Sequence, residues 1–246
     1  MKANLLILKA ALAVSLFASS MAHASLIVNG SFENLAFAGS ETEKGQVKGL
    51  SLEDFAGKNK AWDVYTQLPG WMTVYGEGME LQKNVVSKSQ DGRHHLELDS
   101  HPRNGSNSVI AQQLDNLVVG DKYLLEFFYK PRTNRNNDNG IEAFWFDGAM
   151  NFDTSMDAVF SVDLTRSQAR TWQKQTVLLT ASSTSMSLGF GAFGTQNTLG
   201  GLIDNVSMVH FGGNDQVTAQ VTEPSTLLIL IGGLLAAFGI RRKNAK

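Results

Sequence analysis

The sequence predicts an all-β fold, a β-sandwich, and three observations support this prediction. Short segments rich in aromatic and β-branched residues recur through the middle of the chain, for example at residues 123–129. Clusters of Asn, Asp and Gly separate them, for example at residues 136–140. No long segment with a 3.6-residue apolar period lies between the two ends of the chain. Short strands and turns at this spacing are typical of two packed antiparallel sheets.

Seven segments are predicted to be strands, because each is apolar or alternates polar and apolar residues. They are residues 26–28, 95–99, 123–129, 141–146, 172–180, 185–193 and 202–211. One weak helical stretch is expected over residues 51–60. The glycines at 189, 191, 194, 200 and 201 do not follow a strand–loop–helix pattern, so they indicate bulges and tight turns and not a phosphate-binding loop.

Residues 1–24 have the composition of a secretory signal peptide, which we expect to be helical. Lys2 supplies the positive start, an apolar stretch follows, and the segment closes with Ala22-His23-Ala24. We therefore predict export through the secretory pathway and cleavage by signal peptidase between Ala24 and Ser25. The chain has no Cys, so the exported fold is stabilised without disulfides.

The C-terminal end combines a short apolar span with a basic stop. Residues 227–240 carry no charge, but a helix of this length spans only about 21 Å of the roughly 30 Å hydrocarbon core. Arg241 and Arg242 follow at once, which favours a cytoplasmic end. Together with Thr222-Glu223-Pro224, this arrangement resembles the PEP-CTERM sorting tail of bacterial exported proteins. A plain C-terminal transmembrane anchor is the alternative.

The resemblance implies recognition by an exosortase-type membrane protease. A transient inner-membrane anchor would then be followed by transfer to the cell surface or release outside the cell. The predicted organisation is a signal peptide at 1–24, one sandwich domain at 25–211, a linker at 212–222 and a sorting tail at 223–246. Both tails are basic, so the domain is more acidic than the net charge of −2 suggests. An acidic domain is a poor nucleic-acid binder, and no nucleic-acid partner is expected.

The two ends of the domain carry the second resemblance. Residues 26–33 (LIVNGSFE) and 201–207 (GLIDNVS) resemble the first and last strands of galactose-binding-like jelly rolls, the fold of many carbohydrate-binding modules. With residues 68–71 (LPGW) and 129–132 (YKPR), the order of fragments is similar to DUF642-type domains of plant cell-wall proteins and bacterial PEP-CTERM proteins.

This resemblance implies a jelly-roll sandwich whose first and last strands lie side by side, often with a structural Ca²⁺ between them. The ligands would be the carboxylates of Glu33 and Asp204, with backbone carbonyls near Asn29 and Ser31. Ca²⁺ prefers such oxygen ligands. The alternative is that both carboxylates only accept hydrogen bonds from turn amides.

Candidate sugar-binding residues are aromatic or polar residues near predicted loops. Trp71 and Tyr75 precede a Gly-rich loop and are candidates for a stacking platform. His94, Arg132 and Asn136 are candidates for hydrogen bonds to sugar hydroxyls. Trp145 and Trp172 lie within apolar strand patterns and are expected in the core, and the alternative for residues 132–139 is a solvated hairpin tip.

No catalytic centre is apparent, and we predict that the protein is not an enzyme. Glu97 and Asp99 lie two residues apart on a predicted strand, a spacing that is also typical of a solvated face. No G-x-S-x-G motif occurs. The sequence therefore predicts an exported, surface-sorted protein that binds or organises extracellular polysaccharide. A structural envelope or matrix protein without sugar binding is the alternative, and a polysaccharide-degrading enzyme is the third.

Overall fold

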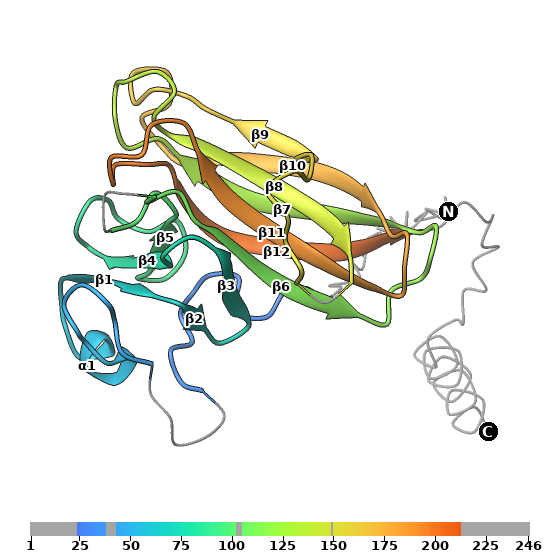
Figure 1. Cartoon of the computed structure of the whole chain (residues 1–246), viewed down its shortest axis with the longest axis horizontal. Coiled ribbons are helices and arrows are strands. Elements are labelled where there is room, and N and C mark those ends of the chain that lie inside the picture. The colour runs from blue at the N-terminus through green and yellow to red at the C-terminus, as the bar shows by residue number, and fades with distance from the viewer. Residues whose placement is uncertain (1–23, 38–42, 102–104, 149, 213–246) are drawn as a thin grey trace, which may run out of the picture.

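The computed structural model describes residues 24–37, 43–101, 105–148 and 150–212, which form two six-stranded antiparallel sheets and one short helix (Figure 1). The predicted all-β sandwich is confirmed. The predicted signal helix, the C-terminal span and all but the first residue of the linker lie outside the described residues. Within the described ranges, no helix has the length and apolar character needed to cross a bilayer.

The first sheet has the strand order β1-β4-β5-β12-β7-β10, and the second has the order β2-β3-β6-β11-β8-β9. The strands of the first sheet are β1 Ala61–Tyr65, β4 Met79–Lys83, β5 His95–Glu97, β12 Leu202–Gly212, β7 Lys122–Lys130 and β10 Gln173–Thr180. The strands of the second are β2 Gln67–Leu68, β3 Trp71–Tyr75, β6 Val109–Asp115, β11 Ser185–Phe193, β8 Gly140–Asp147 and β9 Phe160–Val162. The helix, α1, spans Leu52–Ala56.

The last eight strands have jelly-roll topology. From β5 to β12 the chain crosses between sheets at every connection except β8 to β9. The result is two four-stranded sheets, β5-β12-β7-β10 and β6-β11-β8-β9, as in an eight-stranded jelly roll. The final strand β12 lies inside its sheet, between β5 and β7. Strands β1 to β4 extend one edge of each sheet.

The main core lies between the sheets and is rich in aromatic rings. Leu125, Phe127 and Tyr129 alternate along β7 and all point into it. Phe190 contacts both Phe127 and Trp71, with ring centroids 5.0 and 6.1 Å apart. A smaller apolar cluster covers part of the outer face of the second sheet, where Val109, Ala111, Phe144 and Phe146 are packed beneath residues of the 150–158 segment.

Most predicted strands are present, but the opening strand is not. Residues 26–28 form turns and not a strand, because Asn29 and Phe32 adopt the left-handed conformation, with φ near 54° and 57°. The segment still lies along β12: the Leu26 amide donates to the Met208 carbonyl at 2.8 Å. The expected helix over 51–60 is only five residues long. Ser51 caps its start, and the chain leaves it at Gly57.

The expectation of a solvated face at Glu97 and Asp99 is wrong, because both residues are buried. Asp99 accepts hydrogen bonds from the amides of Asn197 and Leu199, and Glu97 pairs with Arg132. Loops therefore cover this part of the outer face of the first sheet. Strand alternation alone does not reveal such a covering.

Candidate functional site

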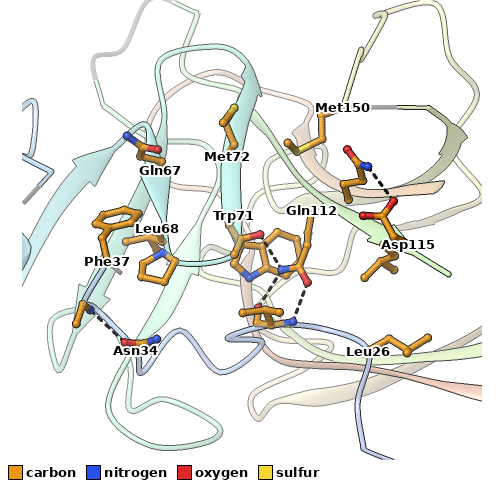
Figure 2. A pocket seen from close by; sticks show the side chains of 16 residues that line it. Leu26, Asn34, Phe37, Gln67, Leu68, Trp71, Met72, Gln112, Asp115 and Met150 are labelled. Atoms are coloured by element: carbon orange, nitrogen blue, oxygen red, sulfur yellow. Dashed lines mark hydrogen bonds between the residues drawn. The ribbon is translucent and has the colours of Figure 1, made fainter. Parts of the chain in front are cut away.

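An open groove of about 610 Å³ lies beside β2, β3 and β6 (Figure 2). Sixteen residues line it: Leu26, Val28, Asn34, Ala36, Phe37, Gln67, Leu68, Pro69, Gly70, Trp71, Met72, Gln112, Gln113, Leu114, Asp115 and Met150. They come from the N-terminal segment, the β2–β3 hairpin, β6 and the loop after β8. Segments distant in sequence therefore meet in this groove.

The amide side chain of Gln112 holds one wall of the groove in place. Its Oε1 accepts a hydrogen bond from the Val28 amide at 2.7 Å, and its Nε2 donates to the Val28 carbonyl at 2.9 Å. The same Nε2 donates to the Gly70 carbonyl at 2.8 Å (Figure 2). Asn29 Nδ2 adds a bond to the Pro69 carbonyl at 3.0 Å. Both residues tie the N-terminal segment to the β2–β3 hairpin.

The groove combines apolar surface with planar polar groups. Met72 is exposed and Phe37 is half-buried, while Asn34 and Gln67 are exposed. Gln113 Nε2 donates to Asp115 Oδ1 at 2.9 Å. This bond and a second one from Ser185 hold the pKa of Asp115 below its usual range, so Asp115 is a carboxylate at neutral pH. Carboxamides and a carboxylate can all bind hydroxyl groups.

A smaller hollow, which we call the pocket, adjoins the same strands and has a volume of about 140 Å³. It is lined by Tyr75, Asn107, Val109, Glu142, Phe144, Phe152, Thr154, Met156, Gly191 and Ala192. Strands β3 and β6 and the 150–156 segment each contribute to both the groove and the pocket. The two hollows are therefore neighbours.

The predicted stacking role of Trp71 is wrong. Trp71 is 2% exposed and packs against Phe32 and Phe190, so neither face of its ring is free for a sugar. Its Nε1 donates to the Asn29 carbonyl at 3.2 Å. Tyr75 is 51% exposed and lines the pocket, so its role in ligand binding stays a prediction.

The other three candidates line neither hollow. His94 is buried beside Phe55, with Nδ1 3.1 Å from Glu33 Oε2, and burial lowers its pKa. Arg132 pairs with the buried Glu97 and donates to the Thr198 carbonyl at 3.0 Å. Asn136 is exposed in the β7–β8 connection. The five candidates therefore do not form one site. Two of them, Trp71 and His94, are buried in structural contacts.

The two carboxylates predicted to bind calcium accept hydrogen bonds from the same loop. Glu33 Oε1 accepts from the amides of Arg93 and His94, and Asp204 Oδ2 accepts from those of Gln90 and Asp91. These bonds agree with the alternative in which the carboxylates serve turn amides. Desolvation raises the pKa of Asp204 to about 7.

The predicted carbonyl ligands differ in their contacts. The Asn29 carbonyl accepts from Phe32 and Trp71, while Ser31 is half-buried. No set of three or more His, Asp or Glu side chains suited to a metal occurs in the described ranges. Calcium binding stays a prediction. An ion at this place would need backbone carbonyls as further ligands, and its removal by a chelator would lower the Tm of the protein.

Sequence reasoning missed most of the groove, including Phe37, Gln67, Met72 and Gln113. Their positions depend on how the N-terminal segment crosses the β2–β3 hairpin, and no local pattern predicts that crossing. One signal was present: Glu142 interrupts the apolar face of β8, and it lines the pocket.

The C-terminal segment provides the clearest comparison with known proteins. Residues 220–243 match the PEP-CTERM protein-sorting motif. This motif indicates an exported protein with a C-terminal sorting signal, and it implies processing by an exosortase. The predicted sorting tail is thereby confirmed, and its residues lie outside the described part of the structure.

Two curated relatives match over 139 residues, which is 56% of the chain. Both are multifunctional-autoprocessing repeats-in-toxin proteins, one from Vibrio vulnificus at 30% identity and one from Vibrio cholerae at 28% identity. The chain spans only 2% and 3% of the length of these relatives.

Solved structures with a similar arrangement include carbohydrate-binding modules. TmCBM61 in complex with β-1,4-galactotriose is 14% identical, with 76% of this chain and 98% of that chain covered and a TM-score of 0.39. A CBM4 structure is 15% identical over 75% and 99%, with a TM-score of 0.35. The CBM22-1 xylan-binding domain of Paenibacillus barcinonensis Xyn10C is 13% identical over 58% and 86%, with a TM-score of 0.39.

Proposed function

We propose that this exported protein binds an extracellular polysaccharide chain through the groove. The observation that carries the proposal is the combination of apolar and planar polar side chains around one open hollow. Sugar rings present C–H faces that pack on apolar side chains such as Met72 and Phe37. Their hydroxyls pair with amides such as Asn34 and Gln67.

The size of the groove supports a chain segment as the ligand. Its volume of about 610 Å³ falls within the range of about 300–1,000 Å³ typical of sites for molecules with many atoms. No Lys or Arg lines it, and Asp115 contributes a negative charge. A neutral polysaccharide fits this lining better than a strongly anionic one.

The proposed role is binding without hydrolysis. Glycoside hydrolysis generally needs two carboxyl groups on either side of the bond that is cleaved. Asp115 and Glu142 line different hollows. Glu80 and Glu97 do lie together, bridged by the Gln82 amide, but both are buried. These positions support a binding protein.

Affinity electrophoresis of the full chain in non-ionic detergent tests this proposal. Gels containing galactan, xylan or a β-glucan should retard the wild-type protein. The double variant Gln67→Ala and Met72→Ala removes exposed groove side chains, so the dissociation constant should rise at least tenfold. Lys174→Ala, on the other sheet, is the control and should behave as the wild type.

Equal retardation of the groove variant, or no retardation of the wild type on any polysaccharide, would reject the proposal. Release of reducing ends would instead indicate an enzyme.

A structural envelope or matrix protein is the second candidate, and a row of exposed and half-buried apolar residues favours it. Leu178 pairs with Leu124, which pairs with Val209, across three strands of the first sheet. Leu178 is 47% exposed, and Phe211 at the end of β12 is 62% exposed. Self-association through this row would be abolished in Leu178→Ser, as measured by sedimentation. A Leu178→Ser variant that assembles as the wild type does would remove this candidate.

A further inference from the structure

The pocket has an aromatic wall and a glycine at its base. Phe152 lies against Phe144 with ring centroids 4.9 Å apart, and against Tyr75 with centroids 6.4 Å apart. Gly191 pairs with Glu142 across β11 and β8. A Cβ at Gly191 would come within 2.9 Å of Val109 Cγ2 and 3.2 Å of Phe144 Cε2. The absence of a side chain at Gly191 therefore lets Val109 and Phe144 pack closely beside Glu142.

Two hydrogen-bond acceptors at the pocket lack donors from the described residues. Glu142 is half-buried, and burial raises the pKa of its carboxyl above the usual range, with no hydrogen bond or charge that offsets the shift. Asn107 Nδ2 donates to the Gly194 carbonyl at 3.2 Å, while its buried Oδ1 has no partner in this part of the chain. None of the ten lining residues is Lys or Arg.

We propose that the pocket binds an organic ammonium group. A cation is attracted to the faces of aromatic rings, and a partly buried carboxylate is stabilised by a cation that donates to it. An ammonium held between Tyr75, Phe152 and Glu142 satisfies both requirements. A neutral hydroxyl offers a donor but leaves the charge of Glu142 without a partner.

The ammonium can belong to either of two kinds of molecule. One is an amino sugar with a free amine, in a polysaccharide that also enters the neighbouring groove. The other is a small or lipid-borne primary ammonium such as ethanolamine. With a volume of about 140 Å³, the pocket admits a single group and not a chain segment. The proposal concerns the pocket alone and does not require that the groove bind sugar.

Calorimetric titration of the full chain in non-ionic detergent tests the proposal with two matched pairs of probes. The first pair is the tetrasaccharide of β-1,4-linked glucosamine and its N-acetylated form, which differ in charge. The second pair is ethanolamine and its uncharged analogue propan-1-ol. At least one cationic probe should bind ten times more tightly than its neutral counterpart. The pair that shows this difference identifies the source of the ammonium.

Glu142→Gln keeps the shape of the side chain and removes its charge. The dissociation constant of the cationic probe should therefore rise at least tenfold, and that of the neutral probe should not change. Tyr75→Ala, at an exposed position, should also weaken the cationic probe. Glu126→Gln, on the other sheet, is the matched control and should bind as the wild type. Equal binding of charged and neutral probes, or full binding by Glu142→Gln, would overturn the proposal.

The same titrations separate this proposal from polysaccharide binding by the groove. Loss of all charge preference with retained glycan binding would reject the ammonium site and leave the groove proposal intact. Ethanolamine binding that depends on Glu142, without binding of any polysaccharide, would support the ammonium site and reject the groove proposal.

Discussion

Trp71 and Tyr75 lie four residues apart on β3 but have different environments. Trp71 packs in the core, whereas Tyr75 faces the pocket. A register shift between Thr73 and Tyr75 in the pairing with β6 interrupts the regular alternation of side chains. The sequence predicted that an aromatic residue near this loop would be exposed. It could not show which one, because the irregularity arises from pairing with a distant strand.

The first residue-scale prediction follows from the burial of Trp71. Trp71→Ala should lower the free energy of unfolding by about 3–5 kcal/mol, because it leaves a cavity in the core. Tyr75→Ala should change the free energy of unfolding much less, because the Tyr75 side chain is exposed and its removal leaves no cavity in the core. Urea unfolding followed by circular dichroism measures both variants. Similar losses in the two would contradict the assignment of Trp71 to the core.

A second residue-scale prediction concerns His95, which is buried on β5 against Trp172. Burial lowers the pKa of His95 to about 3, so the folded protein keeps the ring neutral. The unfolded chain gains this proton as the pH falls through its ordinary value of about 6.5. His95 therefore removes stability between about pH 6.5 and 3, by at most about 1.4 kcal/mol per pH unit.

The measurement for His95 is the difference in unfolding free energy between the wild type and His95→Gln at several pH values. This difference isolates His95 from carboxyl groups with raised pKa values, such as Asp204, which act in the opposite direction. The advantage of the wild type should shrink as the pH falls from 7 to 4. A difference that does not vary with pH would show that His95 does not titrate as described.

Among the elements, the sequence predicted β7 and β11 well. β7 alternates buried and half-buried residues, and β11 has the predicted bounds of residues 185–193. β4 went unrecognised because all five of its residues are buried. The core covers one face of it and loops cover the other, so no alternation remains in its sequence. Burial by distant loops is a tertiary effect that a local pattern does not contain.

An element-scale prediction compares two glycines of β11 that lie on the same face. At Gly191 an added Cβ would come within 2.9 Å of Val109, whereas at Gly189 the nearest atoms lie at 3.4 Å. Gly191→Ala should therefore cost about 1–3 kcal/mol through overpacking. Gly189→Ala should be tolerated, because glycine weakens a strand interior. Thermal unfolding measures the Tm of both variants. A Tm that is lower for Gly189→Ala than for Gly191→Ala would contradict the prediction.

For the whole molecule, the sequence predicted the sandwich and the proximity of its two ends, but not the path of the opening segment. The Val206 amide donates to the Gly30 carbonyl at 2.9 Å, so the ends do meet. They meet through turns and single hydrogen bonds, because the left-handed residues Asn29 and Phe32 bend the chain. The same bends bring residues 34–37 to the groove, which is why the groove could not be predicted.

A prediction at this scale concerns the sorting motif at residues 220–243. In a host with an exosortase, the surface-associated protein should have lost its C-terminal segment, with a new end near Thr222-Glu223-Pro224. Mass spectrometry of the mature protein locates that end. Changing Glu223 and Pro224 to Ala should leave the intact chain in the membrane fraction. Mature protein that still ends at Lys246 would show that the motif is not processed.

The central place of β12 affects how this protein must fold after synthesis. Residues 202–212 complete the sheet by entering between β5 and β7, which precede them by about a hundred residues. A nascent chain that lacks this strand leaves two strand edges unpaired and cannot close the sandwich. Such long-range pairing is slow compared with local contacts. The sandwich therefore cannot close until its last strand has emerged, and an unfolded chain is the form that can thread through a narrow export channel.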